Sequence, residues 1–432
     1  MKKILKLLIA TLVITFYSSS YAQLRIEIRQ GIESPIIFAS PLFSGNPIAN
    51  AILRDVIESD LNNSGRFRIL KDSEMISAPT QLSEVNLSDW RLVNADYLLL
   101  GQTEVDGANN YRTAFQLLDV INNQNVLGFR MPVPPEGLRA AGHRIADLIY
   151  ENTLGVQGIF ATRIAYVSQD QAGSDIHYQI VVADIDGTNP VRIIGSSEPL
   201  MSPTWSPDGR KIAYVSFENN RSEIYIQDVL TQFRERVSSR DGINGAPSFS
   251  PDGSKLAITL SQSNGNLDIY MINLDNQDLT RLTDSSAIDT EPTWSPDGDY
   301  IYFTSNRSGN PQIYRVEAEL NGEIERITFE GSYNSRARIS PDGETMVVVH
   351  EINRNFRIAI VDLDTRITQV LSDGQLDESP SFAPNGDVIM FATRERGVGV
   401  LSSVSVDGRI FQKIASIGSD VREPAWSPYA FR

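Results

Sequence analysis

The second half of the chain repeats a pattern of short apolar segments. In each repeat, two apolar strands of three or four residues follow one another, and a short charged strand comes after them. The first of these apolar strands begins at Ile164, Ile212, Leu256, Ile301, Met346 and Ile389. A unit of roughly four short strands that recurs every 40 to 50 residues is typical of β-propeller blades. We therefore predict a mainly β fold, with a six-bladed β-propeller over residues 159–432.

A turn motif marks the same repeat. Ser-Pro-Asp-Gly occurs at 206–209, 250–253, 295–298 and 340–343, a weaker Ala-Pro-Asn-Gly lies at 383–386, and Ser-Pro recurs at 427–428. Proline fixes φ, Asp or Asn bonds to the backbone two residues on, and Gly accepts a positive φ. Asp208, Asp252, Asp297 and Asp342 are therefore interpreted as turn residues and not as acids or metal ligands.

The two ends of the repeat region complement each other. The strand at Ile164 has no turn motif before it, and the segment 424–428 starts a repeat that no strand completes. We predict that the C-terminal segment pairs with the Ile164 strand. One blade would then be built from both ends of the region, and the ring would be closed.

Residues 23–155 show a different pattern. Asn46 followed by Pro47 predicts a helix start, and Ile52 and Val56 lie on the apolar side of that helix. Residues 97–101 are apolar throughout, 111–117 alternate, and 136–152 carry a second helical pattern. These features predict a small α/β domain, joined to the propeller by a linker at 153–158.

The first 22 residues have the composition of a secretory signal peptide. Lys2, Lys3 and Lys6 precede an apolar run that ends in small residues before Ala22, so the mature chain is expected to begin at Gln23. Later in the chain, no run reaches the roughly 18 apolar residues needed to span a bilayer, and no direct membrane insertion is expected. We predict a periplasmic protein, secreted with cleavage of this peptide.

The composition of the chain excludes several kinds of functional site. The chain has no cysteine and a net charge of −16, which excludes disulfides and cysteine sites and disfavours nucleic acid or an anionic membrane as partner. The three histidines are far apart in sequence, and the 184–189 segment lacks the late glutamate of a calcium loop. With no nucleophile elbow and no phosphate loop, we predict no enzymatic activity, no cofactor and no metal site.

Several motifs resemble those of the TolB family, the periplasmic propellers of the Tol-Pal system. The resemblance rests on residues 200–209, 244–247, 290–294 and 424–429 in the propeller, and on 141–143 and 162–167 before it. It extends from the signal peptide to the C-terminus. It implies a monomeric adaptor that binds the peptidoglycan-associated lipoprotein Pal and the C-terminal domain of TolA. Such an adaptor supports the outer membrane and its constriction at cell division. Other outer-membrane proteins, and bacteriocins that mimic Pal, are further candidate partners.

The resemblance also suggests where those partners bind. Segments that precede each Pro-x-aromatic strand share one rim of a propeller, and the family's Pal-facing loops correspond to positions around Ala246 and Thr290. The expected Pal-binding face comprises Leu200, Met201, Asn244, Gly245, Ala246, Thr290, Glu291, Asp377 and Glu378. The chain departs from the family at Ile243, where many relatives carry histidine.

The mature N-terminus is the second expected site. The TolA-binding segment comprises Gln23, Leu24, Arg25, Ile26, Glu27 and Ile28. Its alternating pattern also predicts an edge strand of the first domain, and both interpretations can hold if the segment leaves that sheet to join a partner.

Two other functions stay open at this point. Peptidase propellers carry similar repeats, but they add a hydrolase domain of several hundred residues with a serine elbow, which this sequence does not show. A small-molecule or cation binder could instead use the propeller channel, with carboxylates such as Glu291 or Asp377 as ligands.

Overall fold

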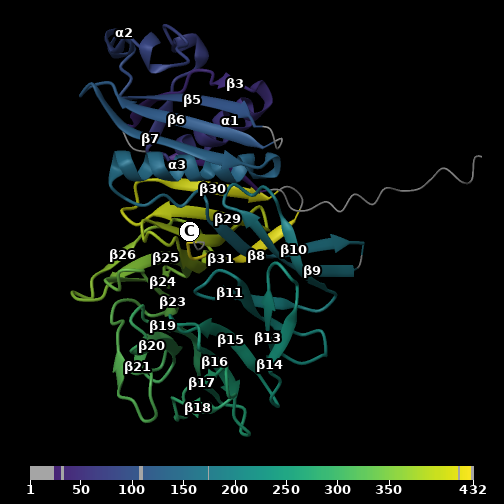
Figure 1. Cartoon of the computed structure of the whole chain (residues 1–432). Helices are drawn as coiled ribbons and strands as arrows, with labels where there is room; N and C mark the ends of the chain where they lie inside the picture. The colour runs from purple at the N-terminus through teal and green to yellow at the C-terminus, as the bar shows by residue number, and fades with distance from the viewer. Residues whose placement is uncertain (1–23, 31–33, 107–109, 174, 417–418, 430–432) are drawn as a thin grey trace, which may run out of the picture.

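The computed structural model describes residues 24–30, 34–106, 110–173, 175–416 and 419–429, so the predicted signal peptide and Gln23 lie outside the described residues. An N-terminal α/β unit stands on a C-terminal propeller (Figure 1). Helix α3 lies between the sheet of the first unit and strand β30 of the propeller. No helix in the described ranges has both the length and the apolar character needed to cross a membrane.

The N-terminal unit is built on one mixed sheet. Its strands are hydrogen-bonded in the order β4-β2-β5-β6-β7, and β3 also pairs with β5. The bounds are β2 Ile36–Ala39, β3 Ser44–Gly45, β4 Phe67–Ile69, β5 Tyr97–Val105, β6 Tyr111–Asp119 and β7 Gln124–Val133. The helices are α1 Pro47–Asn63, α2 Leu87–Leu92 and α3 Leu138–Leu154, with 3-10 turns at Asp72–Glu74, Leu82–Glu84 and Pro135–Gly137.

The elements predicted for this unit are present, and their start signals act as expected. The Asn46 side chain caps α1 by accepting hydrogen bonds of 3.1 Å from the backbone N–H groups of Ile48 and Ala49. Helices α1 and α3 cover one face of the sheet through Leu53, Ile57 and Ile145. The other face carries a second core around Trp90 of α2, so both faces of the sheet are packed.

Six sheets form the propeller, as predicted from the repeat: five of them have four strands, and the sixth has four strands plus β1. The first blade is β31-β8-β9-β10: Asp420–Trp426, Arg163–Ala172, Asp175–Asp184 and Val191–Ser196. The second is β11 Leu200–Trp205, β12 Lys211–Ser216, β13 Glu223–Asp228 and β14 Arg234–Ser238; the third is β15 Asn244–Phe249, β16 Lys255–Ser261, β17 Leu267–Asn273 and β18 Leu279–Arg281. The fourth is β19 Asp289–Trp294, β20 Tyr300–Ser305, β21 Gln312–Glu317 and β22 Ile324–Arg326. The fifth is β23 Asn334–Ile339, β24 Thr345–Ile352, β25 Asn355–Asp362 and β26 Thr368–Val370; the sixth is β27 Glu378–Phe382, β28 Val388–Glu395, β29 Val398–Ser405 and β30 Phe411–Ser416.

The predicted ring closure is confirmed. Strand β31 is antiparallel to β8, with Trp426 opposite Ile164 and Asp420 opposite Gln169. The indole N–H of Trp426 also donates to Thr162 Oγ1 at 2.8 Å. The first blade therefore takes its inner strand from the C-terminus and its other three strands from the start of the propeller.

The aspartates of the repeated motif are turn residues, as expected. In the second blade, Asp208 Oδ1 accepts hydrogen bonds from Ser206 Oγ at 2.5 Å and from the Arg210 N–H at 3.0 Å. The equivalent carboxylate in the third blade is Asp252, and the hydroxyl of Ser250 is the main donor that lowers its pKa to about 2. These carboxylates are thus occupied within their own turns.

The N-terminal segment is a strand, but its predicted sheet is wrong. Strand β1 (Leu24–Gln30) is antiparallel to β30, from Leu24 opposite Ser416 to Gln30 opposite Phe411. It is therefore the fifth strand of the sixth blade and not an edge strand of the α/β sheet. The reason is that β30 is the outer strand of its blade, so its free backbone groups offer an edge to which a segment can add.

A carboxylate on α3 holds the connection between the two units by hydrogen bonds. Asp147 accepts backbone hydrogen bonds from Phe160 at 2.7 Å and from Ala161 at 3.2 Å. Burial raises the pKa of this carboxyl to about 6, although both donors favour its charged form. Because α3 ends at Leu154 and β8 begins at Arg163, we propose this connection as the domain boundary.

Candidate functional site

A repeated backbone irregularity shapes one end of the propeller channel. In every blade the pairing of the innermost strand with its neighbour shifts register near the start of that strand. The irregularity contains a non-glycine residue with a positive φ, between 47° and 57°: Ser202, Ala246, Glu291, Arg336, Ser379 and Glu423. Proline follows in five of the six cases, and it cannot donate to the sheet. The interrupted ladder therefore permits a bulge at this point in each blade.

These six residues form the mouth of the channel, which we call the rim. Together with the five prolines that follow them and Arg338, they line a cavity of about 50 Å³. Beyond it, toward the Ser-Pro-Asp-Gly turns, the channel widens to about 470 Å³ between Trp205, Trp294 and Trp426. Residues held in a sparsely populated conformation at one end of a fold are a recognised mark of functional surfaces.

An ion pair joins two neighbouring blades at the mouth. Arg336 Nε donates to Glu291 Oε1 at 2.7 Å, and its guanidinium also contacts Ser379 Oγ. Burial opposes the charge on Arg336, but the carboxylates of Glu291, Glu423 and Glu378 outweigh it and raise the pKa of this side chain. On the opposite side, Glu423 Oε2 accepts the backbone N–H of Ser202 at 2.6 Å. The mouth thus carries both signs of charge, with each group engaged by a neighbouring blade.

The predicted Pal-face residues divide into two groups. Gly245, Ala246, Thr290, Glu291 and Glu378 are half-buried at the rim, and Met201 is exposed there. Leu200, Asn244 and Asp377 are buried, so their side chains support the rim from inside. Asn244 Oδ1, for example, accepts from Ser238 Oγ at 2.6 Å, and Asp377 Oδ2 accepts from Ser372 Oγ at 2.5 Å.

Two further groups lie at the rim, and of their members only Met201 belongs to the expected Pal-binding face. Arg336 and Arg338 had no signal, because Ala337 takes the place of the proline that marks the other five strands. The second group consists of exposed apolar side chains on four successive blades, at the same end as the rim: Met201, Ile243, Ile288 and Phe329. Apolar side chains are also exposed at the opposite end of the propeller, at Leu230, Phe233, Leu320 and Ile367. Those at the rim differ in lying at the same end as the bulged strands and the ion pair.

The two carboxylates considered as channel cation ligands have other roles in the structure. Glu291 pairs with Arg336. Asp377 is buried beside Ser372 and Thr393, whose hydroxyl groups both donate to it. The segment 184–189 forms a turn between two strands, in which the Gly187 N–H donates to the Asp184 carbonyl at 2.8 Å.

Comparison with known proteins identifies the family. The TolB amino-terminal domain matches residues 24–126, and the TolB beta propeller domain matches residues 150–430. The Tol-Pal system protein TolB of Nitrosococcus oceani is 51% identical over 414 residues, which are 95% of this chain and 94% of the relative. That of Methylococcus capsulatus is 52% identical over 407 residues, covering 94% and 95%.

A solved structure gives the same answer. The crystal structure of TolB from Acinetobacter baumannii superposes with a TM-score of 0.88 at 40% identity, and the match covers 94% of this chain and all of that one. Both domains and their order are thus shared along nearly the whole length. The chain belongs to the TolB family of Tol-Pal system proteins.

Proposed function

We propose that this protein is a non-enzymatic periplasmic adaptor that binds Pal through the rim of its propeller. The observation that carries the proposal is the rim itself. Six bulged strands aim side chains around the channel mouth, and exposed apolar residues on four blades lie at the same end. An apolar surface beside engaged charges suits a protein partner. In this role the protein supports outer-membrane integrity and constriction during cell division, and it offers bacteriocins a route of import.

Thr290→Arg is expected to weaken Pal binding. Thr290 is half-buried at the rim, with its hydroxyl 3.4 Å from that of Thr259. A long charged side chain there would obstruct a docked partner and leave a charge at the interface. We expect one-to-one binding of the soluble Pal domain to residues 23–432, and a loss of roughly 10- to 100-fold in affinity for the variant, measured by calorimetric titration.

Leu320→Arg is the matched control. Leu320 is exposed on the turn between β21 and β22, in the same blade as Thr290 but at the opposite end of the propeller. This variant should bind Pal like the parent, and circular dichroism should show that both variants are folded. Equal affinity of the parent and Thr290→Arg would exclude this part of the rim, and no Pal binding by the parent would refute the adaptor proposal.

We also propose that the N-terminal segment binds the C-terminal domain of TolA. The support is its place in the fold: β1 pairs through its backbone with the outer edge of a blade that already has four strands. A strand attached in this way can add to another sheet by the same hydrogen bonds. The segment cannot pair with β30 and with TolA at the same time. If Pal binding favours one of these two states, Pal and TolA binding influence one another, and that influence must be reciprocal.

Deletion of residues 23–28 is therefore expected to abolish TolA binding, whereas one-to-one binding of Pal should be retained. Because the segment is needed in only one of the two interactions, titration of each partner into the same variant separates them. TolA binding that survives the deletion would show that the site lies elsewhere. For the parent, an identical TolA affinity with and without saturating Pal would contradict the coupling.

A further inference from the structure

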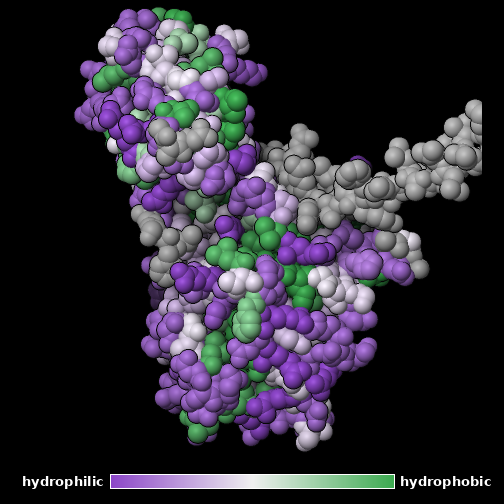
Figure 2. Space-filling model, turned by 45° about the vertical axis from the view of Figure 1, so that its right-hand side comes forward, coloured by the Kyte–Doolittle hydropathy of each residue, from purple (hydrophilic) through white to green (hydrophobic). Residues whose placement is uncertain are grey.

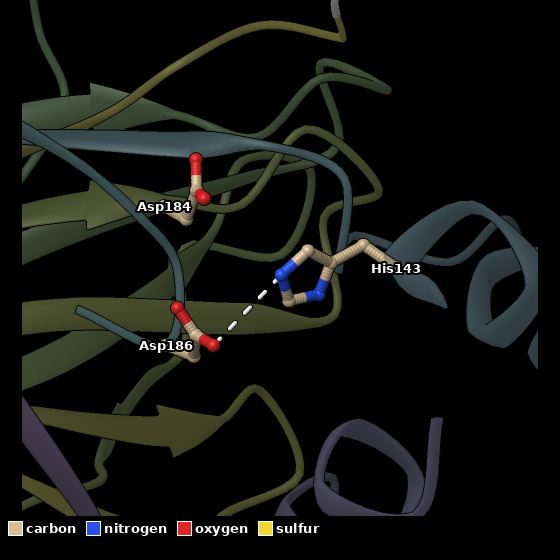
Figure 3. A group of neighbouring side chains, drawn as sticks. All are labelled: His143, Asp184 and Asp186. Atoms are coloured by element: carbon tan, nitrogen blue, oxygen red, sulfur yellow. Dashed lines mark ion pairs between the residues drawn. The ribbon is translucent and has the colours of Figure 1, made fainter. Parts of the chain in front are cut away.

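Three side chains from separate parts of the sequence meet where the two units join. His143 belongs to α3 of the N-terminal unit, whereas Asp184 and Asp186 lie at the turn between β9 and β10 of the first blade. One ligand atom from each lies within 4.8 Å of the other two. Figure 3 shows the imidazole directed toward the carboxylate of Asp186, with Asp184 on the same side.

The two nitrogens of His143 have different surroundings. The residue is only 2% exposed. Its Nδ1 lies 2.7 Å from Asp60 Oδ2 of α1, whereas its Nε2 has no hydrogen-bond partner among the described residues. A carboxylate on Nδ1 favours the tautomer with its proton there. In the neutral imidazole the lone pair of Nε2 then faces the two aspartates of the blade.

The distance from this nitrogen to the Asp186 carboxylate distinguishes a direct hydrogen bond from a shared metal ion. Nε2 lies 3.8 Å from Asp186 Oδ2, which is too long for a hydrogen bond. Two bonds of about 2.1 Å to a shared metal ion separate their outer atoms by roughly 3.3 to 4.2 Å, depending on the angle between them. The gap therefore fits a shared metal ion, which would replace the long ion pair between these two groups.

Hydrogen bonds from neighbouring residues also hold the two carboxylates in their orientation. Asp186 Oδ1 accepts hydrogen bonds from the N–H and the hydroxyl of Thr188 at 2.9 and 2.6 Å, and Asp184 Oδ2 accepts from Asn189 at 2.7 Å. One oxygen of each carboxylate is thus fixed, and the other lies between the histidine and an arginine: Asp186 Oδ2 contacts Arg139, and Asp184 Oδ1 lies 3.9 Å from Arg163 Nε. Carboxylate–histidine–metal arrays of this kind, here with Asp60 behind His143, are the usual second layer of protein zinc sites.

Arginine is the competitor at this position. The guanidinium of Arg139 contacts Asp186 Oδ2 and donates to Thr188 Oγ1 at 3.2 Å. Its side chain is 37% exposed, so it can turn away into water. Arg163, beside Asp184, is 51% exposed and can turn away likewise. The carboxylates of Asp60, Asp184 and Asp186 outnumber these two arginines by one, and that excess favours a cation.

We propose that His143, Asp184 and Asp186 bind one Zn²⁺ ion, which links the N-terminal unit to the first blade. Imidazole and carboxylate groups are ordinary zinc ligands, and water completes a tetrahedral site with three protein ligands. Because the ligands come from both units, the ion fixes α3 against the propeller. Because the three ligands meet only in the folded chain, the ion also stabilises that state by mass action.

The test is Zn²⁺ titration into untagged, chelator-treated protein comprising residues 23–432. We expect saturation at one ion per chain by calorimetry and a melting temperature that rises with Zn²⁺. Asp184→Asn removes one ligand without disturbing the buried histidine and should weaken binding roughly tenfold or more. His143→Ala should do the same.

His177→Ala is the matched control, because His177 is exposed on the β8–β9 hairpin of the same blade. It should bind Zn²⁺ and gain stability like the parent. If His143→Ala does not fold, Asp184→Asn decides alone. The proposal is overturned if the parent shows no saturable binding at millimolar Zn²⁺, if Asp184→Asn binds as tightly as the parent, or if only His177→Ala loses the ion.

Discussion

Deletion of residues 420–432 is expected to open the propeller ring and to lower the melting temperature more than any single substitution in the first blade. The deletion removes β31, which is the innermost strand of that blade. Strand β8 then becomes a free edge on the inner side of the ring. The deletion also removes the buried side chains of Val421 and Trp426.

Contacts to both neighbouring blades add to this loss. The indole N–H of Trp205 in the second blade donates to the Ala425 carbonyl at 3.0 Å, and the Trp426 N–H donates to Ser381 Oγ of the sixth blade at 2.9 Å. The segment therefore joins the first and last parts of the propeller to each other. Without it, the ring has two open ends, and blade packing no longer resists separation there.

Trp426→Ala is expected to lower the melting temperature in the same way, but by less than the deletion. Removal of a buried tryptophan side chain costs about 3–5 kcal/mol, so a fall in melting temperature on the order of 10 °C is expected by calorimetry. Trp294→Ala is the control, because Trp294 has the same position and burial in the fourth blade, which is continuous in sequence. The two substitutions should cost similar amounts, and the deletion should exceed both. A deletion variant that melts within a few degrees of the parent would contradict closure by β31.

Arg336→Ala is expected to destabilise the protein by about 2–4 kcal/mol. Removal of one member of a buried ion pair leaves the other charge without a partner, at a cost of about 3–5 kcal/mol. We take a lower range because the side chains of Arg336 and Glu291 are 30% and 23% exposed at the channel mouth. Glu378 and Glu423 lie close enough to contribute to the field at Arg336, so the variant also leaves like charges facing one another.

A double-mutant cycle with Glu291→Gln separates the charge effect from the loss of packing. The double variant should be more stable than Arg336→Ala alone, because the unpaired carboxylate is gone. Arg409→Ala is the matched control, since that arginine is 75% exposed and lies 3.9 Å from Asp407. It should change the free energy of denaturant unfolding by less than about 0.5 kcal/mol. Equal effects of Arg336→Ala and Arg409→Ala would show that the mouth does not depend on its ion pair.

Local patterns in the sequence were sufficient for much of the fold. The Ser-Pro-Asp-Gly motif predicted its turns, since Ser206, Asp208 and Arg210 interact within one turn. The cap at Asn46 and the alternation around Phe115 were equally local, and the incomplete repeat at 424–428 predicted closure because a missing strand can be counted. The prolines of the inner strands also indicated one shared rim.

The remaining features depended on contacts between distant parts of the chain. Alternation predicted a strand at 24–30, but any sheet edge can accept such a strand, and only the packed structure pairs it with β30. Some residues of the predicted Pal-binding face are buried and others are half-buried or exposed. Whether Asn244 lines the rim or supports it from inside depends on its packing, which its own segment does not determine. Arg336 had no signal in its own segment. His143 meets Asp184 and Asp186 only because α3 docks on the first blade. Turn chemistry acts over a few residues and is readable in sequence, whereas strand partners and ligand clusters arise from long-range packing, which only the tertiary structure decides.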